Sequence, residues 1–75
     1  MNIQNFINKN SAGEYLVKGA LDNYVVYCDN VPQCMVNHAS AKLVIVDAEN
    51  NGDLINVVRE ALEIEFGQAF SEVLI

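Results

Sequence analysis

Hydrophobic and polar residues alternate with two different periods along the chain, and each period predicts a type of element. Near the beginning, Ile3, Phe6 and Ile7 recur at spacings of three and four residues, the repeat of a helix that buries one side. This spacing predicts a short N-terminal helix over residues 2–9. The small and polar residues 10–13 include a glycine and are expected to end it.

The helical repeat returns in a longer segment, residues 53–64. Asp53 is the expected N-cap and Gly67 the expected stop signal, because short acceptor side chains cap helix starts and glycine adopts the left-handed conformation that ends helices. The apolar residues cover an arc of roughly 200°, wider than the stripe of about 100° that packing on one sheet requires. We therefore expect this main helix to contact the sheet and also the first helix or another subunit. Glu65 would fall within the arc, so we expect the helix to end before it.

Two segments with a period of two predict a β-hairpin over residues 14–29. Residues 14–21 and 24–29 read as strands, and Asp22-Asn23 between them suits a two-residue turn, since both residue types tolerate positive φ. This turn would pair Leu21 with Tyr24. One face of the hairpin is then apolar and is expected to join the core, whereas the other is half polar and is expected to see solvent. The half-polar face carries Glu14, Leu16, Lys18, Val25, Tyr27 and Asp29.

The second half of the chain predicts a strand, a helix and a further strand. Residues 30–33 are expected to interrupt the pairing, because Pro32 has no backbone N–H to donate, and residues 34–41 fit either a connection or a strand. The continuous apolar run 43–46 is typical of a central strand. Residues 69–75 predict the last strand, with a right-handed crossover if the two strands are parallel.

These elements predict one α+β domain over residues 1–75. The expected sheet has three to four strands, including the 14–29 hairpin, and is packed by the main helix and the short N-terminal helix. The expected core consists of Val17, Leu21, Val26, Val44, Ile45, Val46, Leu54, Val58, Leu62, Phe70 and Leu74.

Length and composition bear on function. A chain of 75 residues leaves little room for a pocket of about 300 Å³ or more, the usual size of a small-molecule site. We therefore expect no enzymatic activity and no cofactor. The chain is 52% hydrophobic and 19% charged, and a body this small buries only about 60% of its surface. Some apolar side chains should stay outside and mark a contact surface.

The negative charge lies in the C-terminal part of the chain. The net charge is −6; positive and negative residues balance over residues 1–42, and Arg59 is the only basic residue after them. An acidic surface repels nucleic-acid phosphates and anionic membranes, whereas it attracts basic protein surfaces. We therefore expect a protein partner with a basic surface and no direct binding of nucleic acid or membrane. The candidate partner-binding residues are Asp47, Glu49, Asp53, Glu60 and Glu63.

Two groups of residues suggest metal chemistry without completing a site. Cys28, Cys34 and His38 are the only soft ligands in the chain, whereas a structural zinc ion takes four. We expect ordinary cysteines and a hydrogen-bonded or exposed histidine, with a metal- or redox-linked protein as an alternative. The loop that starts at Asp47 partly matches a calcium loop, but Val58 occupies the position of the bidentate glutamate. We expect a plain strand-to-helix loop there.

Targeting signals and composition complete the sequence-based picture. We see no leader and no apolar run of about 18 residues, so we expect a cytoplasmic protein. Ten of the 75 residues are asparagine, as in the AT-rich coding genomes of many phages. This profile of size, acidity and asparagine content is similar to that of phage-encoded inhibitors of host defence, such as anti-CRISPR and anti-restriction proteins, and includes no motif of that group. The similarity implies an inhibitor that blocks a basic, nucleic-acid-handling host protein. The alternative is a structural or accessory subunit that forms a homo-oligomer, of which a homodimer is the smallest form.

Overall fold

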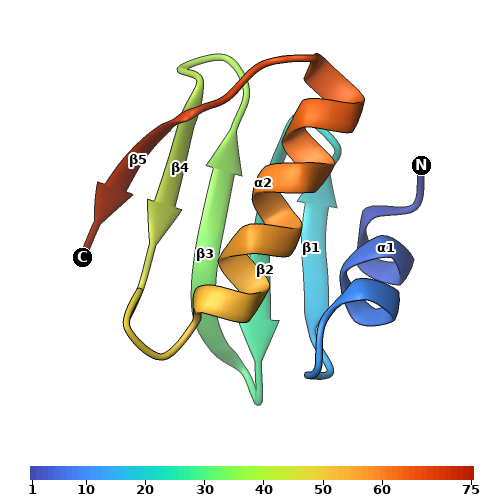
Figure 1. Cartoon of the computed structure of the whole chain (residues 1–75), viewed down its shortest axis with the longest axis vertical. Coiled ribbons are helices and arrows are strands. Elements are labelled where there is room, and N and C mark those ends of the chain that lie inside the picture. The colour runs from blue at the N-terminus through green and yellow to red at the C-terminus, as the bar shows by residue number, and fades with distance from the viewer.

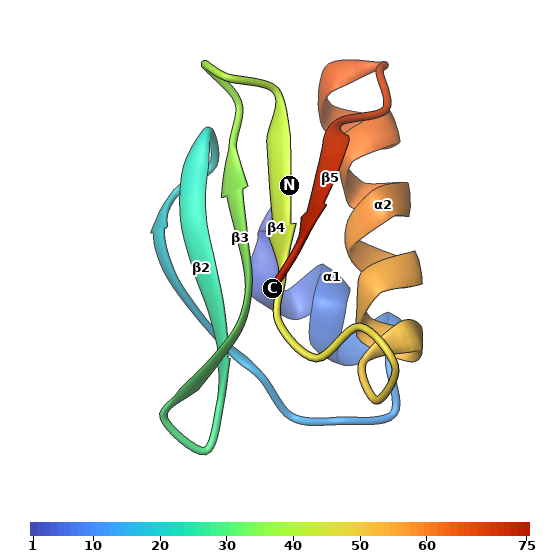
Figure 2. The same ribbon diagram turned by 90° about the vertical axis from the view of Figure 1, so that its left-hand side faces the viewer.

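A five-stranded sheet carries two helices on one side. The computed structural model describes residues 1–75, and Figures 1 and 2 show the sheet face-on and from its edge. The helices are α1 (Ile3–Asn10) and α2 (Gly52–Phe66). The strands are β1 (Leu16–Ala20), β2 (Asn23–Cys28), β3 (Val31–Asn37), β4 (Lys42–Ile45) and β5 (Ser71–Leu74). The α+β class is confirmed, with one strand more than expected.

The strands lie in chain order across the sheet. β1 to β4 form an antiparallel meander, and β5 pairs with β4 in parallel after the chain has crossed over through α2. Figure 1 shows that this crossover is right-handed, as strand twist dictates. Neither helix combines the length and the apolar character that crossing a membrane requires.

The hairpin forms, but with a different register from the one expected. Ala20 pairs with Asn23, so the turn consists of Leu21 and Asp22, and the prediction that Leu21 pairs with Tyr24 was wrong. Gly19 explains the register, because its φ is +125° and a Cβ there would overlap the carbonyl oxygen of Asn23. The sum of the two paired residue numbers falls by two, an even number, so the side chains that lie within both strands keep their predicted faces. Leu21 leaves the ladder and lies in the turn.

The interruption expected at residues 30–33 was wrong for residues 31–33, which belong to β3, the strand that pairs with β2. Asp29 and Asn30 adopt positive φ values of 49° and 65° and make the turn, so β3 starts at Val31 and runs through Pro32. Pro32 is tolerated because it faces Tyr27 at the point where the β2–β3 register shifts and a ladder bond is already lost. The segment left open by the sequence thereby becomes the end of a central strand and a turn.

The main helix is longer at both ends than residues 53–64. Asn51 occupies the N-cap position, while Asp53 lies in the first turn and accepts a hydrogen bond of 2.8 Å from the backbone N–H of Ala12. Gly67 is the stop, with φ 66° and its N–H bonded to Glu63. Because this stop lies after Phe66, the helix includes Glu65, against expectation. Its half-buried carboxylate lies 3.6 Å from the amino group of Met1.

The core lies between the sheet and the helices. α1 packs against α2 and contributes the fully buried Ile7, so the first helix accounts for the second contact of the wide apolar arc. Six expected core residues are buried: Val26, Ile45, Leu54, Val58, Leu62 and Phe70. Val17 packs against their edge. Four other predictions were wrong, since Leu21 and Leu74 are exposed, and Val44 and Val46 are only half buried on the other face of the sheet.

Candidate functional site

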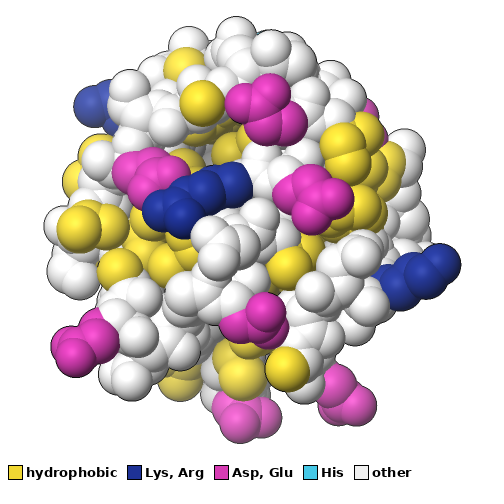
Figure 3. Space-filling view, in the orientation of Figure 1, with side chains coloured by type: hydrophobic (Ala, Val, Ile, Leu, Met, Phe, Trp, Pro, Cys, Tyr) yellow, Lys and Arg dark blue, Asp and Glu magenta, His cyan; other side chains and the backbone are white.

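The outer side of α2 and the loop before it form an acidic surface. Asp53, Glu60 and Glu63 are exposed and lie at spacings of seven and three residues, which places them along one stripe of the helix. Asp47 and Glu49 are exposed in the loop that leads into α2. We call these five residues the acidic surface. Figure 3 shows acidic side chains spread over the face of the molecule that α2 covers.

Two of the five acidic residues have partners within the chain. Asp47 has a positive φ of 52° and accepts hydrogen bonds of 3.0 and 2.9 Å from the side-chain amide of Asn50. Asp53 holds the backbone of Ala12 and so ties the loop after α1 to the start of α2. Both residues therefore have structural roles that close loops, which leaves them less free to meet a partner.

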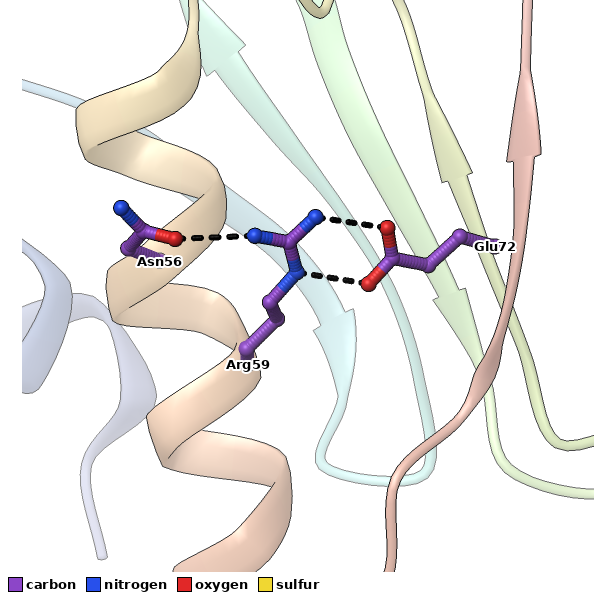
Figure 4. Close-up of polar contacts among 3 residues, drawn as sticks. All are labelled: Asn56, Arg59 and Glu72. Atoms are coloured by element: carbon purple, nitrogen blue, oxygen red, sulfur yellow. Dashed lines mark hydrogen bonds and ion pairs between the residues drawn. The ribbon is translucent and has the colours of Figure 1, made fainter.

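The other three carboxylates, those of Glu49, Glu60 and Glu63, make no hydrogen bond or ion pair. Arg59, the one basic residue of α2, is held by Glu72 of β5 through two bonds of 2.6 and 2.7 Å and by Asn56 at 2.8 Å (Figure 4). Hydrogen bonding within this pair raises the pKa of Arg59 and lowers that of Glu72. The arginine is thus already neutralised, and the negative charge of the acidic surface stays uncompensated.

The opposite side of the molecule is an apolar sheet face that no helix covers. The residues in register across it include Val25, Met35, Val44 and Val73. We call this side the open face; its apolar side chains are those of Leu16, Val25, Tyr27, Met35, Val44, Val46, Val73 and Ile75. The sequence predicted solvent contact only for the part of this face that belongs to the hairpin. The apolar run of β4 indicated a strand buried on both sides.

The open face contains a hollow and very little charge. The hollow has a volume of about 260 Å³ and is lined by Val25, Tyr27, Pro32, Cys34, Met35, Val44, Val46 and Ile75. Strand alternation places Lys18 and Lys42 on this face, and Lys18 lies 5.2 Å from the centre of the Tyr27 ring. No strand places a carboxylate there. The strands of the open face thus carry only positive charge, whereas the acidic surface lies on the other side of the molecule; Glu14 and Asp29 flank the open face beside Leu16 and Tyr27.

The largest hollow is a groove beside the β2–β3 turn that is open to solvent. Its volume of about 620 Å³ exceeds the room that the chain length led us to expect. It is lined by Asn8, Gly13, Glu14, Tyr15, Leu16, Tyr27, Asp29 and Asn30. Its ionisable groups are two carboxylates and two tyrosines, without a histidine, cysteine or basic residue. Burial is the main cause that raises the pKa of Tyr15, which keeps this phenol protonated.

Cys28, Cys34 and His38 do not come together as the metal alternative requires. Cys34 is buried in the core, where burial raises the pKa of its thiol to about 12, and Cys28 is half buried at the end of β2. His38 stacks on Phe66 at 4.1 Å between ring centres. Both cysteines are free, and no three histidine, cysteine or acidic residues are grouped to hold a metal ion. These three residues therefore form no metal site within one chain.

One polar group within the core lacks a partner. Tyr24 is 2% exposed, and its hydroxyl has no hydrogen-bond partner. Burial is the main cause that raises its pKa above the ordinary value. An unpaired buried hydroxyl costs stability, so this residue is a weak point of the core.

The chain has no match among protein-family models, curated proteins or solved structures. Function has to be inferred from the chemistry of the molecule's own surfaces. The two that differ most from an ordinary protein surface are the acidic surface on the helical side and the open face on the other.

Proposed function

We propose that this chain is a small cytoplasmic protein-binding module without catalytic activity. It uses the acidic surface to cover a basic, nucleic-acid-binding surface of another protein, and acts as a phage or mobile-element inhibitor of host defence. The observation that supports this most is the uncompensated charge of Glu49, Glu60 and Glu63 beside an arginine that Glu72 already holds.

The charge arrangement favours a basic protein over other partners. Surfaces that bind nucleic acids carry Lys and Arg placed to neutralise phosphates, and carboxylates in a row on a rigid helix compete for the same groups. Glu60 and Glu63 are one helical turn apart, about 5–6 Å between Cβ atoms. Complementary charge mainly speeds association and makes it depend on salt.

Charge reversal at two of the free glutamates tests the proposal. A candidate partner is captured from a bacterial lysate and purified, and the kinetics of its association with the chain are measured between 50 and 500 mM salt. We expect Glu60→Lys with Glu63→Lys to slow association about tenfold or more and to flatten its salt dependence. The wild-type chain should also displace nucleic acid from that partner.

The matched control changes the net charge equally at another place. Glu14→Lys with Asp22→Lys also adds four positive charges, but both residues are exposed in loops that lie outside α2 and outside the acidic surface. We expect this control to change the association rate less than about twofold. Equal effects of the two double variants, or no effect of the first, would contradict the proposal.

A further inference from the structure

We propose that the open face is the interface of a homodimer, in which two copies pack sheet against sheet. This inference concerns the opposite side of the molecule from the acidic surface and does not depend on the proposed inhibitor function. It is supported by the sequence of β4, the cross-strand register, the available area and the distribution of charge.

The sequence of β4 is typical of a strand that is buried on both sides. Leu43 and Ile45 point into the core and are 1% exposed, whereas the intervening Val44 and the following Val46 are only half buried. Continuous apolar runs belong to strands with both faces covered. Within a single chain the helices cover only one side of β4, and nothing covers the other side.

The missing cover extends across four strands. Val25, Met35, Val44 and Val73 face one another in successive pairs from β2 to β5. Met35 is 41% and Val73 38% exposed, although such a row is what interdigitates when two sheets pack about 10 Å apart. A polar row at one end of the sheet marks the rim: it consists of Asn23, Asn37, Lys42 and Ser71.

The size of the open face allows a specific dimer. The molecule measures 27 by 26 Å along its two longer dimensions, which limits the face to at most about 700 Å² per copy. Two such faces would bury at most about 1,400 Å² together, an upper limit that lies within the range of about 1,200–2,000 Å² that specific interfaces bury. The hollow of about 260 Å³ gives side chains of the other copy a place to enter.

Charge favours a second copy as the occupant. The net charge is −6, yet the only charged residues on the strands of the open face are Lys18 and Lys42; Glu14 and Asp29 lie in the groove at its edge, and the acidic surface lies on the far side of the sheet. Two copies that meet through their open faces therefore keep the carboxylates of the acidic surface outward, where repulsion is screened by solvent. A small domain also gains most from such an arrangement, because its own core is limited.

The experiment compares two substitutions that place the same charge on opposite sides. The mass of the wild-type chain, Met35→Glu and Ile64→Glu is measured by sedimentation equilibrium from 1 to 100 µM. Ile64 is 57% exposed on α2 and serves as the control. We expect the wild type and Ile64→Glu to approach twice the 8.3 kDa monomer mass, and Met35→Glu to raise the dimer Kd at least about 100-fold, because each interface would bury two unpaired carboxylates.

Two further measurements separate loss of the dimer from loss of the fold. For a dimer, the denaturation midpoint rises with protein concentration, and this dependence should vanish in Met35→Glu while the folded circular dichroism spectrum remains. If Met35→Glu does not fold, Val73→Lys at the exposed β5 takes its place. The dimer Kd should not weaken between 50 and 500 mM salt, in contrast to binding through the acidic surface.

Three results would overturn the proposal. A wild-type chain that is monomeric at 100 µM would exclude a second copy and leave the open face to a different protein. An unchanged dimer in Met35→Glu would place the interface elsewhere. Equal weakening in Ile64→Glu would show that added charge, and not its position, is the cause.

Discussion

The two faces of the sheet come from the same strands and the same alternation of side chains, yet one is buried under the helices and the other is left uncovered. On β2, Tyr24 and Val26 point toward the helices and are 2% and 0% exposed, whereas their neighbours Val25 and Tyr27 remain half buried. Alternation sorts side chains into two sets, but only the position of α1 and α2 decides which set becomes a core. A strand can therefore be apolar on a side that its own chain never covers.

The comparison also explains the high apolar content. Hydrophobic residues make up 52% of the chain, but only 14 of 75 residues are buried. About a third of the remaining hydrophobic residues lie on the open face, not in a crowded interior. Polar surface is concentrated on the helical side, in the loops and at one end of the sheet, so the two sides of this small domain have different chemistry.

The sharpest test of the difference uses two identical, adjacent residues of β2. We expect Val26→Ala to lower the free energy of unfolding by about 2 to 3 kcal/mol, because it removes two methyl groups and leaves a cavity. Val25→Ala on the open face should cost less than about 1 kcal/mol. Urea unfolding at a protein concentration near 1 µM measures both values for the monomer. Equal losses would mean that the faces are covered alike.

A smaller effect on the free energy of unfolding is expected at Tyr24, the weak point of the covered face. Tyr24→Phe removes a hydroxyl that is buried without a partner, so we expect a gain of about 1 kcal/mol in the free energy of unfolding. A loss would show that the hydroxyl has a hydrogen-bond partner in solution.

The same substitution has a pH signature. Burial raises the pKa of Tyr24 in the folded chain, so above about pH 10 the unfolded chain releases a proton that the folded chain retains. Wild-type stability should then fall as the pH rises through this range. In Tyr24→Phe the fall should be shallower, as measured by urea unfolding between pH 8 and 11.

The smallest effect concerns the rim of the covered face, where Arg59 links α2 to β5. The side chains of Arg59 and Glu72 are 48% and 32% exposed, so solvent screens their attraction and Glu72→Gln should cost only about 0.5 kcal/mol at pH 7. The arginine lowers the pKa of Glu72 in the folded chain. Its contribution is therefore present above the ordinary glutamate pKa and is lost as the pH falls through the lowered value. The two chains should reach equal stability in strongly acidic urea titrations; a difference that persists there would point to lost packing.

Local signals predicted most of the elements but not their limits. Both helices, the stop at Gly67 and the hairpin follow from spacing and from the conformational preferences of single residues. The sequence left β3 open between a connection and a strand, because Pro32 usually argues against a strand. Pro32 is tolerated because of a register shift against Tyr27 that only the paired structure reveals. The register of the hairpin depends on the close approach of Gly19 to Asn23, a contact between strands.

The sequence predicted which residues form the acidic surface, but not which of them are bound to other residues of the chain. The five acidic residues are exposed as expected, yet their availability depends on partners distant in sequence: Asp53 is bound to Ala12, and Arg59 to Glu72. The Asp47–Asn50 and Arg59–Asn56 bonds each span three residues, and the first of them follows a local turn pattern. Likewise, the stacking of His38 on Phe66 has no counterpart in local spacing, which is why a ligand role was considered for the histidine.

From the right-handed return of the chain to β4 we expect a particular order of assembly. Each antiparallel pair closes through a short turn, but β5 reaches β4 only after about 25 intervening residues have been placed, and closing a longer loop costs more entropy. All four residues of β5 are exposed, so the strand gains little from burial and relies on the docking of α2 beside it. On a growing polypeptide, the meander can thus form while the outer edge of β4 is still bare, and helix and last strand then join it in a single late step.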